Sequence, residues 1–296
     1  MSGEIAFTNT ALESFAALVT FVLLFACIAK IKMQRGIKHV TSKNAKRNTL
    51  DYILIIWLVI HMIVLTADVL SWTAMDFGKN EVWLLFMLNL TFTCLFLECM
   101  VYTYYVKETI YQHEMIGNTY VYLVMLSTVI AIILWITSDI SGKFYYLDTQ
   151  GNYTQGSMYW LCQFYCIIVM CGNIVILLKH RKALVRHDVL SLLMYGLIPI
   201  ASIPAQMLWK STTFNLATTL ALIYICISVH MAQYDRIVEQ EKLLIQQEHE
   251  LSMNQMQMMI AQIQPHFLYN SLTALAQLCS KDPKEAKKTI INFADY

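Results

Sequence analysis

Seven apolar stretches, each near the length that crosses a lipid bilayer, most constrain what this chain can fold into. A helix needs roughly 20 apolar residues to span the hydrocarbon core. Within lipid every backbone N–H and C=O group must find a partner inside the protein, so such stretches form helices. We therefore predict an all-α membrane protein built on a seven-transmembrane-helix bundle. The predicted spans are, in chain order, Ala11–Ala29, Leu50–Trp72, Val82–Val106, Tyr120–Ile136, Met158–Leu178, Val189–Leu208 and Phe214–Met231.

Composition supports this fold class. Hydrophobic residues make up 57% of the chain and charged residues only 14%, whereas about 25% of the residues of a soluble domain are charged. Most of the chain therefore faces something other than water, and we expect membrane lipids to surround the bundle. We expect no nucleic-acid partner.

The positions of the basic residues predict how the bundle is oriented. The stretch from Lys30 to Arg47 holds seven Lys or Arg residues and no acidic residue, and the loop after the fifth span adds four more. The opposite side has only Lys79, Lys143 and Lys210. Because Lys and Arg in short loops stay on the cytoplasmic side, we predict an outside N-terminus and a cytoplasmic C-terminus.

Two further features belong to the membrane part. In the longest outward loop, Ser138–Ser157, aromatic and β-branched residues flank the turn-forming residues 149–152. This pattern predicts an extracellular β-hairpin over the mouth of the bundle. In the sixth span, Pro199 and Pro204 each remove a helix hydrogen bond and favour a kink. Such kinks either take part in motion or only shape the packing.

The composition changes after Met231. Residues 235–262 contain no Gly or Pro and are rich in Glu, Gln, Met, Leu and Ile. Apolar residues recur there every seven positions, which predicts a two-stranded coiled coil; a solvated helix packed on its own protein is the alternative. Glu241 and Glu248 fall where the facing stripe should be apolar, so the seam is weak. The apolar stripe consists of Ile237, Leu244, Leu251 and Met258, with Val238, Ile245 and Met259 beside it.

Three ionisable residues lie within predicted spans: His61 and Asp68 in the second and Glu98 in the third. Ionisable groups are costly in hydrocarbon and usually mark a functional site. Asp68 is in the outer third of its span, where an extracellular ligand or a proton could reach it. A hydrogen bond between helices that fixes packing is the alternative. We leave both open for Asp68 and favour the packing role for His61 and Glu98.

The most specific stretch is residues 262–270, Gln-Ile-Gln-Pro-His-Phe-Leu-Tyr-Asn. Pro265 frees a backbone carbonyl one turn earlier and predicts a bend before His266. Phe267, Leu268, Leu272 and Leu275 recur at helical spacing and predict an apolar core face. Asn270 lies one turn after His266, within reach of its imidazole. A neutral imidazole nitrogen is a competent nucleophile near neutral pH.

This stretch resembles the phosphoacceptor box of the LytS-type sensor histidine kinases, usually written Gln-Ile-Asn-Pro-His-Phe-Leu-Phe-Asn. The resemblance covers residues 254–296, and it departs at Gln264, Tyr269 and Thr273. The membrane part is more loosely similar to seven-span sensor regions of bacterial histidine kinases and diguanylate cyclases. We accordingly expect a seven-transmembrane sensor domain at 1–232, a signalling helix at 233–258 and a dimerisation and phosphotransfer hairpin at 259–296.

The resemblance implies a function. His266 would accept the γ-phosphoryl group of ATP and pass it to an aspartate of a response regulator, with Pro265 and Asn270 shaping its surroundings. The protein would be a homodimer in a bacterial cytoplasmic membrane and would respond to an unknown extracellular ligand. ATP with Mg²⁺ would be bound by a domain that follows the hairpin.

That ATP-binding domain is missing from residues 1–296, where no phosphate-cradling glycine motif occurs. We therefore expect a truncated chain that is inactive as a kinase by itself. The first alternative function is a non-catalytic seven-span receptor or adaptor that signals through its coiled coil. The second is a transporter, suggested by Asp68, Glu98 and the two prolines, although transport has no counterpart for the Pro-His-Phe box.

Overall fold

The computed structural model describes residues 3–36, 42–77, 81–111, 115, 117–148, 153–209 and 213–294. The chain divides into two compact units, Met1–His230 and Met231–Tyr296. The helices are α1 (Gly3–Gly36), α2 (Ser42–Phe77), α3 (Glu81–Tyr111), α4 (Thr119–Ile136), α5 (Ser138–Ser141), α6 (Trp160–Lys179), α7 (Arg186–Trp209), α8 (Thr213–Lys281) and α9 (Pro283–Ala294). Helix α8 contributes to both units.

Seven segments of the described helices are long and apolar enough to cross a membrane, which confirms the predicted number. Most of their first and last residues lie within a few positions of those of the predicted spans. The segments are Phe7–Lys32, Thr49–Ala74, Glu81–Tyr111, Thr119–Ile136, Trp160–Lys179, Arg186–Gln206 and Thr213–Met231.

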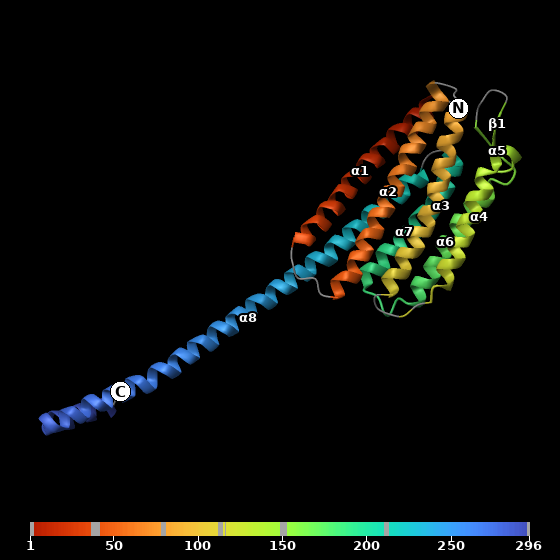
Figure 1. Cartoon of the computed structure of the whole chain (residues 1–296). Helices are drawn as coiled ribbons and strands as arrows, with labels where there is room; N and C mark the ends of the chain where they lie inside the picture. Colours follow the sequence, from red (N-terminus) through yellow and green to blue (C-terminus); the bar gives the residue numbers. More distant parts are fainter. Residues whose placement is uncertain are drawn as a thin grey trace. The chain divides into compact units, whose positions relative to one another are not determined.

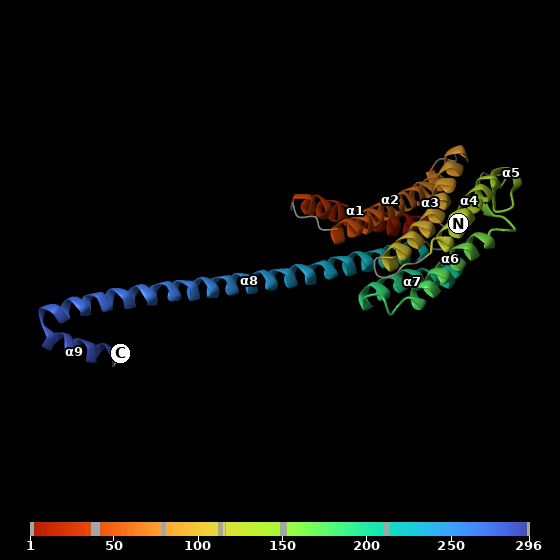
Figure 2. The same ribbon diagram turned by 60° about the horizontal axis from the view of Figure 1, so that its bottom comes forward.

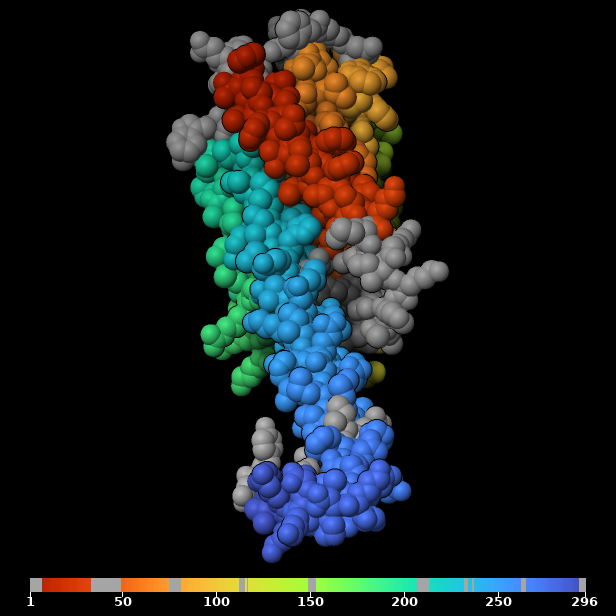
Figure 3. All heavy atoms as spheres, turned by 90° about the vertical axis from the view of Figure 1, so that its left-hand side faces the viewer, coloured from red at the N-terminus to blue at the C-terminus, as the bar shows by residue number. Residues whose placement is uncertain are grey.

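In the first unit, α2 packs against both α1 and α3, and α6 packs against α3 and α7 (Figure 1). The centre of this bundle is aromatic. The ring of Trp57 meets Tyr195 edge-on with centroids 4.5 Å apart, and the Tyr102 hydroxyl donates to the backbone oxygen of Leu192 at 2.8 Å. These contacts join α2, α3 and α7. The first turns of α8 lie beside α1 (Figure 3), where Cys27 and Cys226 share one buried cluster.

Two short strands, β1 (Tyr145–Leu147) and β2 (Tyr153–Gln155), pair antiparallel with Tyr146 opposite Thr154. They lie in the loop where a hairpin was predicted. The predicted turn at residues 149–152 lies outside the described residues, and the side of the membrane on which the strands lie stays a prediction.

Buried Ser138 anchors this strand pair to the end of α4. Its Oγ accepts from the backbone N–H groups of Phe144 and Tyr145 at 3.0 and 2.9 Å, and donates to the carbonyl of Tyr145 at 3.0 Å. The Tyr145 hydroxyl lies within hydrogen-bonding distance of side-chain oxygens of Asp139 and Asn89, and its single hydrogen is donated to one of them. Burial, and then the bond to Asp139, raise the pKa of Tyr145, so the phenol remains a donor near neutral pH.

The second unit consists of the later part of α8 and of α9, which turns back along the end of α8 (Figure 2). Asp282 caps α9, because its Oδ1 accepts from the backbone N–H groups of Lys284 and Glu285 at 3.1 and 3.2 Å. Pro283 occupies the first helical position, where its missing N–H costs nothing. Ala286 is buried in this turn of the chain.

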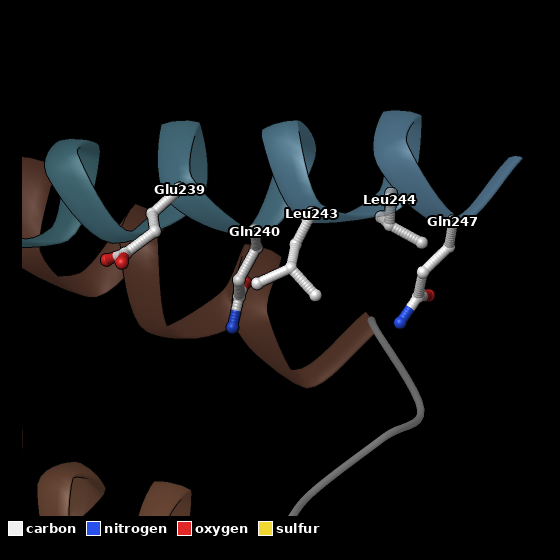
Figure 4. Close-up of a pocket in the computed structure, with 5 residues that line it drawn as sticks. All are labelled: Glu239, Gln240, Leu243, Leu244 and Gln247. Carbon is white, nitrogen blue, oxygen red and sulfur yellow. The ribbon is translucent and has the colours of Figure 1, made fainter. Parts of the chain in front are cut away.

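The predicted apolar stripe lies on the surface of the second unit. Ile237, Leu244, Leu251 and Met258 are each about 60% exposed. Figure 4 shows the part of this helix around Leu244, where a shallow hollow is formed by side chains of α8. Its lining residues are Glu239, Gln240, Leu243, Leu244 and Gln247. The single chain therefore leaves the stripe uncovered, and the coiled coil stays a prediction.

Candidate functional site

Among the described residues, each unit contains a polar site. The site of the second unit is the stretch around His266. Its imidazole is exposed, and the Asn270 side-chain nitrogen lies 3.3 Å from Nδ1 and 3.4 Å from Nε2. Since an amide N–H can only donate, this contact uses a ring nitrogen that carries no hydrogen. The Asn270 amide therefore contacts the ring through the nitrogen whose lone pair is also the nucleophile, and this contact orients the imidazole.

Helix α8 continues across Pro265. The bend predicted before His266 stays a prediction. The apolar face predicted around His266 is not a core in this chain, because Phe267, Leu268 and Leu272 are 51–60% exposed. A helix of one chain presents this face to solvent, and burying it requires another surface.

The site of the first unit is a buried polar network that joins four helices. His61 on α2 is 0% exposed and Glu98 on α3 is 2% exposed, and His61 Nδ1 lies 2.8 Å from Glu98 Oε1. The other ring nitrogen, Nε2, lies 2.9 Å from Thr219 Oγ1 on α8. Thr219 donates in turn to the backbone oxygen of Asn215 at 2.8 Å.

The network continues through the side chain of Asn215. Its Nδ2 donates to Glu13 Oε1 on α1 at 3.0 Å and to Asp68 Oδ2 on α2 at 2.9 Å. The Ser71 hydroxyl donates to the backbone oxygen of Asp68 at 2.8 Å and lies 3.4 Å from its Oδ1. Asp68 is partly exposed, whereas Glu13 is fully buried. One residue of α8 thus binds carboxylates from two other helices.

The structure brings together some of the residues predicted from sequence and separates others. His61 pairs with Glu98, while Asp68 bonds to Asn215 and Ser71 although it shares a helix face with His61. Sequence reasoning missed Glu13, Asn215 and Thr219. Glu13 lies inside the first predicted span, so an acidic residue within an apolar run was the signal that could have found it.

A second pairing, also missed, lies toward the other end of α1 and α2. Lys30 Nζ lies 2.6 Å from Asp51 Oδ1, with both side chains at most 10% exposed. Lys30 had been counted only as a basic loop residue. Within the described residues, no group of three or more His, Cys, Asp or Glu side chains could hold a metal ion.

We predict that Asn215→Leu destabilises the first unit by about 3 kcal/mol, because two hydrogen bonds to carboxylates are lost at about 1.5 kcal/mol or more each. Thermal unfolding in lipid nanodiscs would measure this loss. Low pH should reduce the loss, since protonated carboxyl groups no longer repel and can donate. Thr66→Val is the matched control, because the exposed Thr66 hydroxyl bonds to carbonyls of its own helix. Equal effects of the two variants at all pH values contradict the prediction.

Comparison with known proteins bears on the second unit. Residues 254–296 match the family model described as histidine kinase. The match begins on α8 before Pro265 and includes His266, Asn270 and α9. A search among curated proteins finds no match for the chain.

Proposed function

We propose that this chain is the sensor and phosphoacceptor part of a membrane-bound, LytS-type histidine kinase of a two-component system. The observation that carries the proposal is the exposed His266 beside the Asn270 amide, inside the residues that match the histidine kinase family. The seven apolar helices of the first unit fit a membrane sensor. The stimulus is received by the first unit and the phosphoryl group by the second.

The chemistry follows from the imidazole of His266. The ring nitrogen that carries a lone pair attacks the γ-phosphorus of ATP, a P–N bond forms, and the bond to the leaving ADP oxygen breaks. The exposed position lets two partners reach the ring in turn, first the ATP-bearing domain and then the response regulator. Asn270 orients the ring, and its N–H releases the lone pair when the nitrogen attacks. In the complete protein ATP and Mg²⁺ are bound by a domain outside residues 1–296.

The proposal includes a homodimer. The stripe of α8 and the face around Phe267 and Leu268 are both apolar and exposed, and a second copy offers the matching surface. The basic residues of the short loops support an outside N-terminus and a second unit in the cytoplasm of a bacterial cell. The strand pair then lies on the outer face, and the ATP and response-regulator chemistry lies inside.

We predict that His266→Gln abolishes phosphorylation of the full-length gene product, because glutamine has no nucleophilic ring nitrogen. Membranes that contain the protein would be incubated with ATP and Mg²⁺, and acid-labile phosphate would be measured. His249→Gln is the matched control, since His249 is another exposed histidine of α8. Asn270→Ala should slow the reaction on the order of tenfold, about 1.4 kcal/mol. Undiminished acid-labile phosphate in His266→Gln would rule out this acceptor.

We predict that Leu251→Glu weakens dimerisation, because it places a charge in the apolar stripe of both copies. Met256→Glu is the control, as Met256 is similarly exposed, at 58% against 61%, but lies about 140° around the helix from Leu251. Light scattering of the detergent-solubilised protein would report the mass of the complex. A dimer that survives Leu251→Glu as well as Met256→Glu contradicts the proposed interface.

A further inference from the structure

The Thr219 hydroxyl lies between two acceptors, and its bond direction is tied to the protonation of His61. Its single hydrogen can be donated either to the Asn215 carbonyl at 2.8 Å or to His61 Nε2 at 2.9 Å. When the carbonyl receives it, the contact between Thr219 Oγ1 and His61 Nε2 needs a hydrogen on Nε2. With this hydrogen in place, the imidazole is a donor toward α8.

The contact on the other side of the ring then requires a second hydrogen. His61 Nδ1 and Glu98 Oε1 are 2.8 Å apart, and two lone pairs at that distance would repel each other. The hydrogen is either on Nδ1, facing a carboxylate, or on the carboxyl group, facing a neutral ring. Both arrangements contain the same number of protons. Because the pair is buried from water, leaving the contact without this proton would be costly.

We propose that the His61–Glu98 pair is a proton-binding site whose occupancy sets the direction of the hydrogen bond made by Thr219. When one proton leaves, the imidazole keeps a single hydrogen, which serves the Glu98 carboxylate from Nδ1. Nε2 then becomes an acceptor, and the Thr219 hydroxyl turns from the Asn215 carbonyl to the ring. One proton is released and no oxidation or reduction takes place. The side chains of Glu98, His61 and Thr219 each keep a hydrogen-bond partner.

The consequence falls on α8. Thr219 and Asn215 are one turn apart on this helix, and Asn215 is the residue that binds Glu13 and Asp68. Proton loss thus changes the bonding of the turn by which α8 is attached to α1 and α2. This linkage follows from the first unit alone and does not depend on the proposed kinase function.

The other titratable groups around the pair are few. Cys94 and Cys99 on α3 and Tyr195 on α7 interact electrostatically with Glu98. Thiols and phenols ordinarily carry no charge near neutral pH. On the α8 side, the Asn215 amide binds the acidic groups of Glu13 and Asp68, whose carboxyl groups also lie within hydrogen-bonding reach of each other. The His61–Glu98 pair is therefore where an imidazole and a carboxyl group share a proton directly.

Nitrogen NMR of the full chain, labelled with ¹⁵N-histidine in phospholipid nanodiscs, tests the proposal. The signals of His61 are identified by their loss in His61→Gln. When the pH is raised from about 5 to about 9, Nε2 should change from protonated to unprotonated in a single step, while Nδ1 keeps its hydrogen at high pH. If Nε2 of His61 stays protonated, or stays unprotonated, across this pH range, the proposed change in the Thr219 hydrogen bond is contradicted.

Glu98→Gln supplies the first comparison. The amide N–H of the substituted side chain donates to Nδ1 without a shared proton, so Nε2 should stay protonated over the whole range. A titration of His61 in this variant that matches the unmodified protein would overturn the assignment to the pair.

The second comparison uses neighbouring threonines and holds even if Glu98→Gln does not fold. Thr218 and Thr219 are both buried and both donate to the Asn215 carbonyl at 2.8 Å, but the contact with His61 is made by Thr219. Thr219→Val removes the acceptor of the protonated ring, so the transition should shift to lower pH. Thr219→Ser should restore it, and Thr218→Val should leave it unchanged. Identical transitions in Thr219→Val and Thr218→Val would refute the link to α8.

Discussion

The absence of water in the hydrocarbon core is the constraint on which the membrane unit depends. It forces the backbone into helices, and it gives every buried polar side chain a large cost unless a partner is present. The His61–Glu98 contact and the amide of Asn215 meet this requirement across four helices. The same requirement ties the directions of these bonds to the number of protons that the network holds.

The two units meet the cost of exposure in different ways. In the first unit, apolar side chains that face outward meet lipid, so their exposure needs no further partner. In the second unit, Leu251, Met258 and Phe267 are exposed to water, which is unfavourable for a single chain. In the proposed homodimer, a second copy would relieve this cost along α8 and leave His266 within reach of its proposed partners. Helix α8 contains both Thr219 and His266, so one element takes part in the buried network and in the proposed phosphoacceptor site.

The sequence predicted what depends on neighbouring residues and missed what depends on distant ones. The seven spans were found because length and apolarity are local properties, and the strand pair because aromatic residues flank a turn-forming group. The pairing of His61 with Glu98 joins residues 37 positions apart, and that with Thr219 joins residues 158 apart. No local pattern encodes such contacts. The contact of Asn270 with His266 was predicted because one helical turn separates the two residues. The apolar face around Phe267 was predicted to be a core face but is exposed in the single chain, because helical spacing does not show which surface covers a face.

Residue-level mapping of acid-labile phosphate on the full-length gene product, purified from cells without prior acid treatment, tests the central claim most directly. If the proposed function is correct, the phosphate is found on the imidazole of His266. Phosphate on another histidine, or acid-stable phosphate on a hydroxyl side chain in its place, would contradict it.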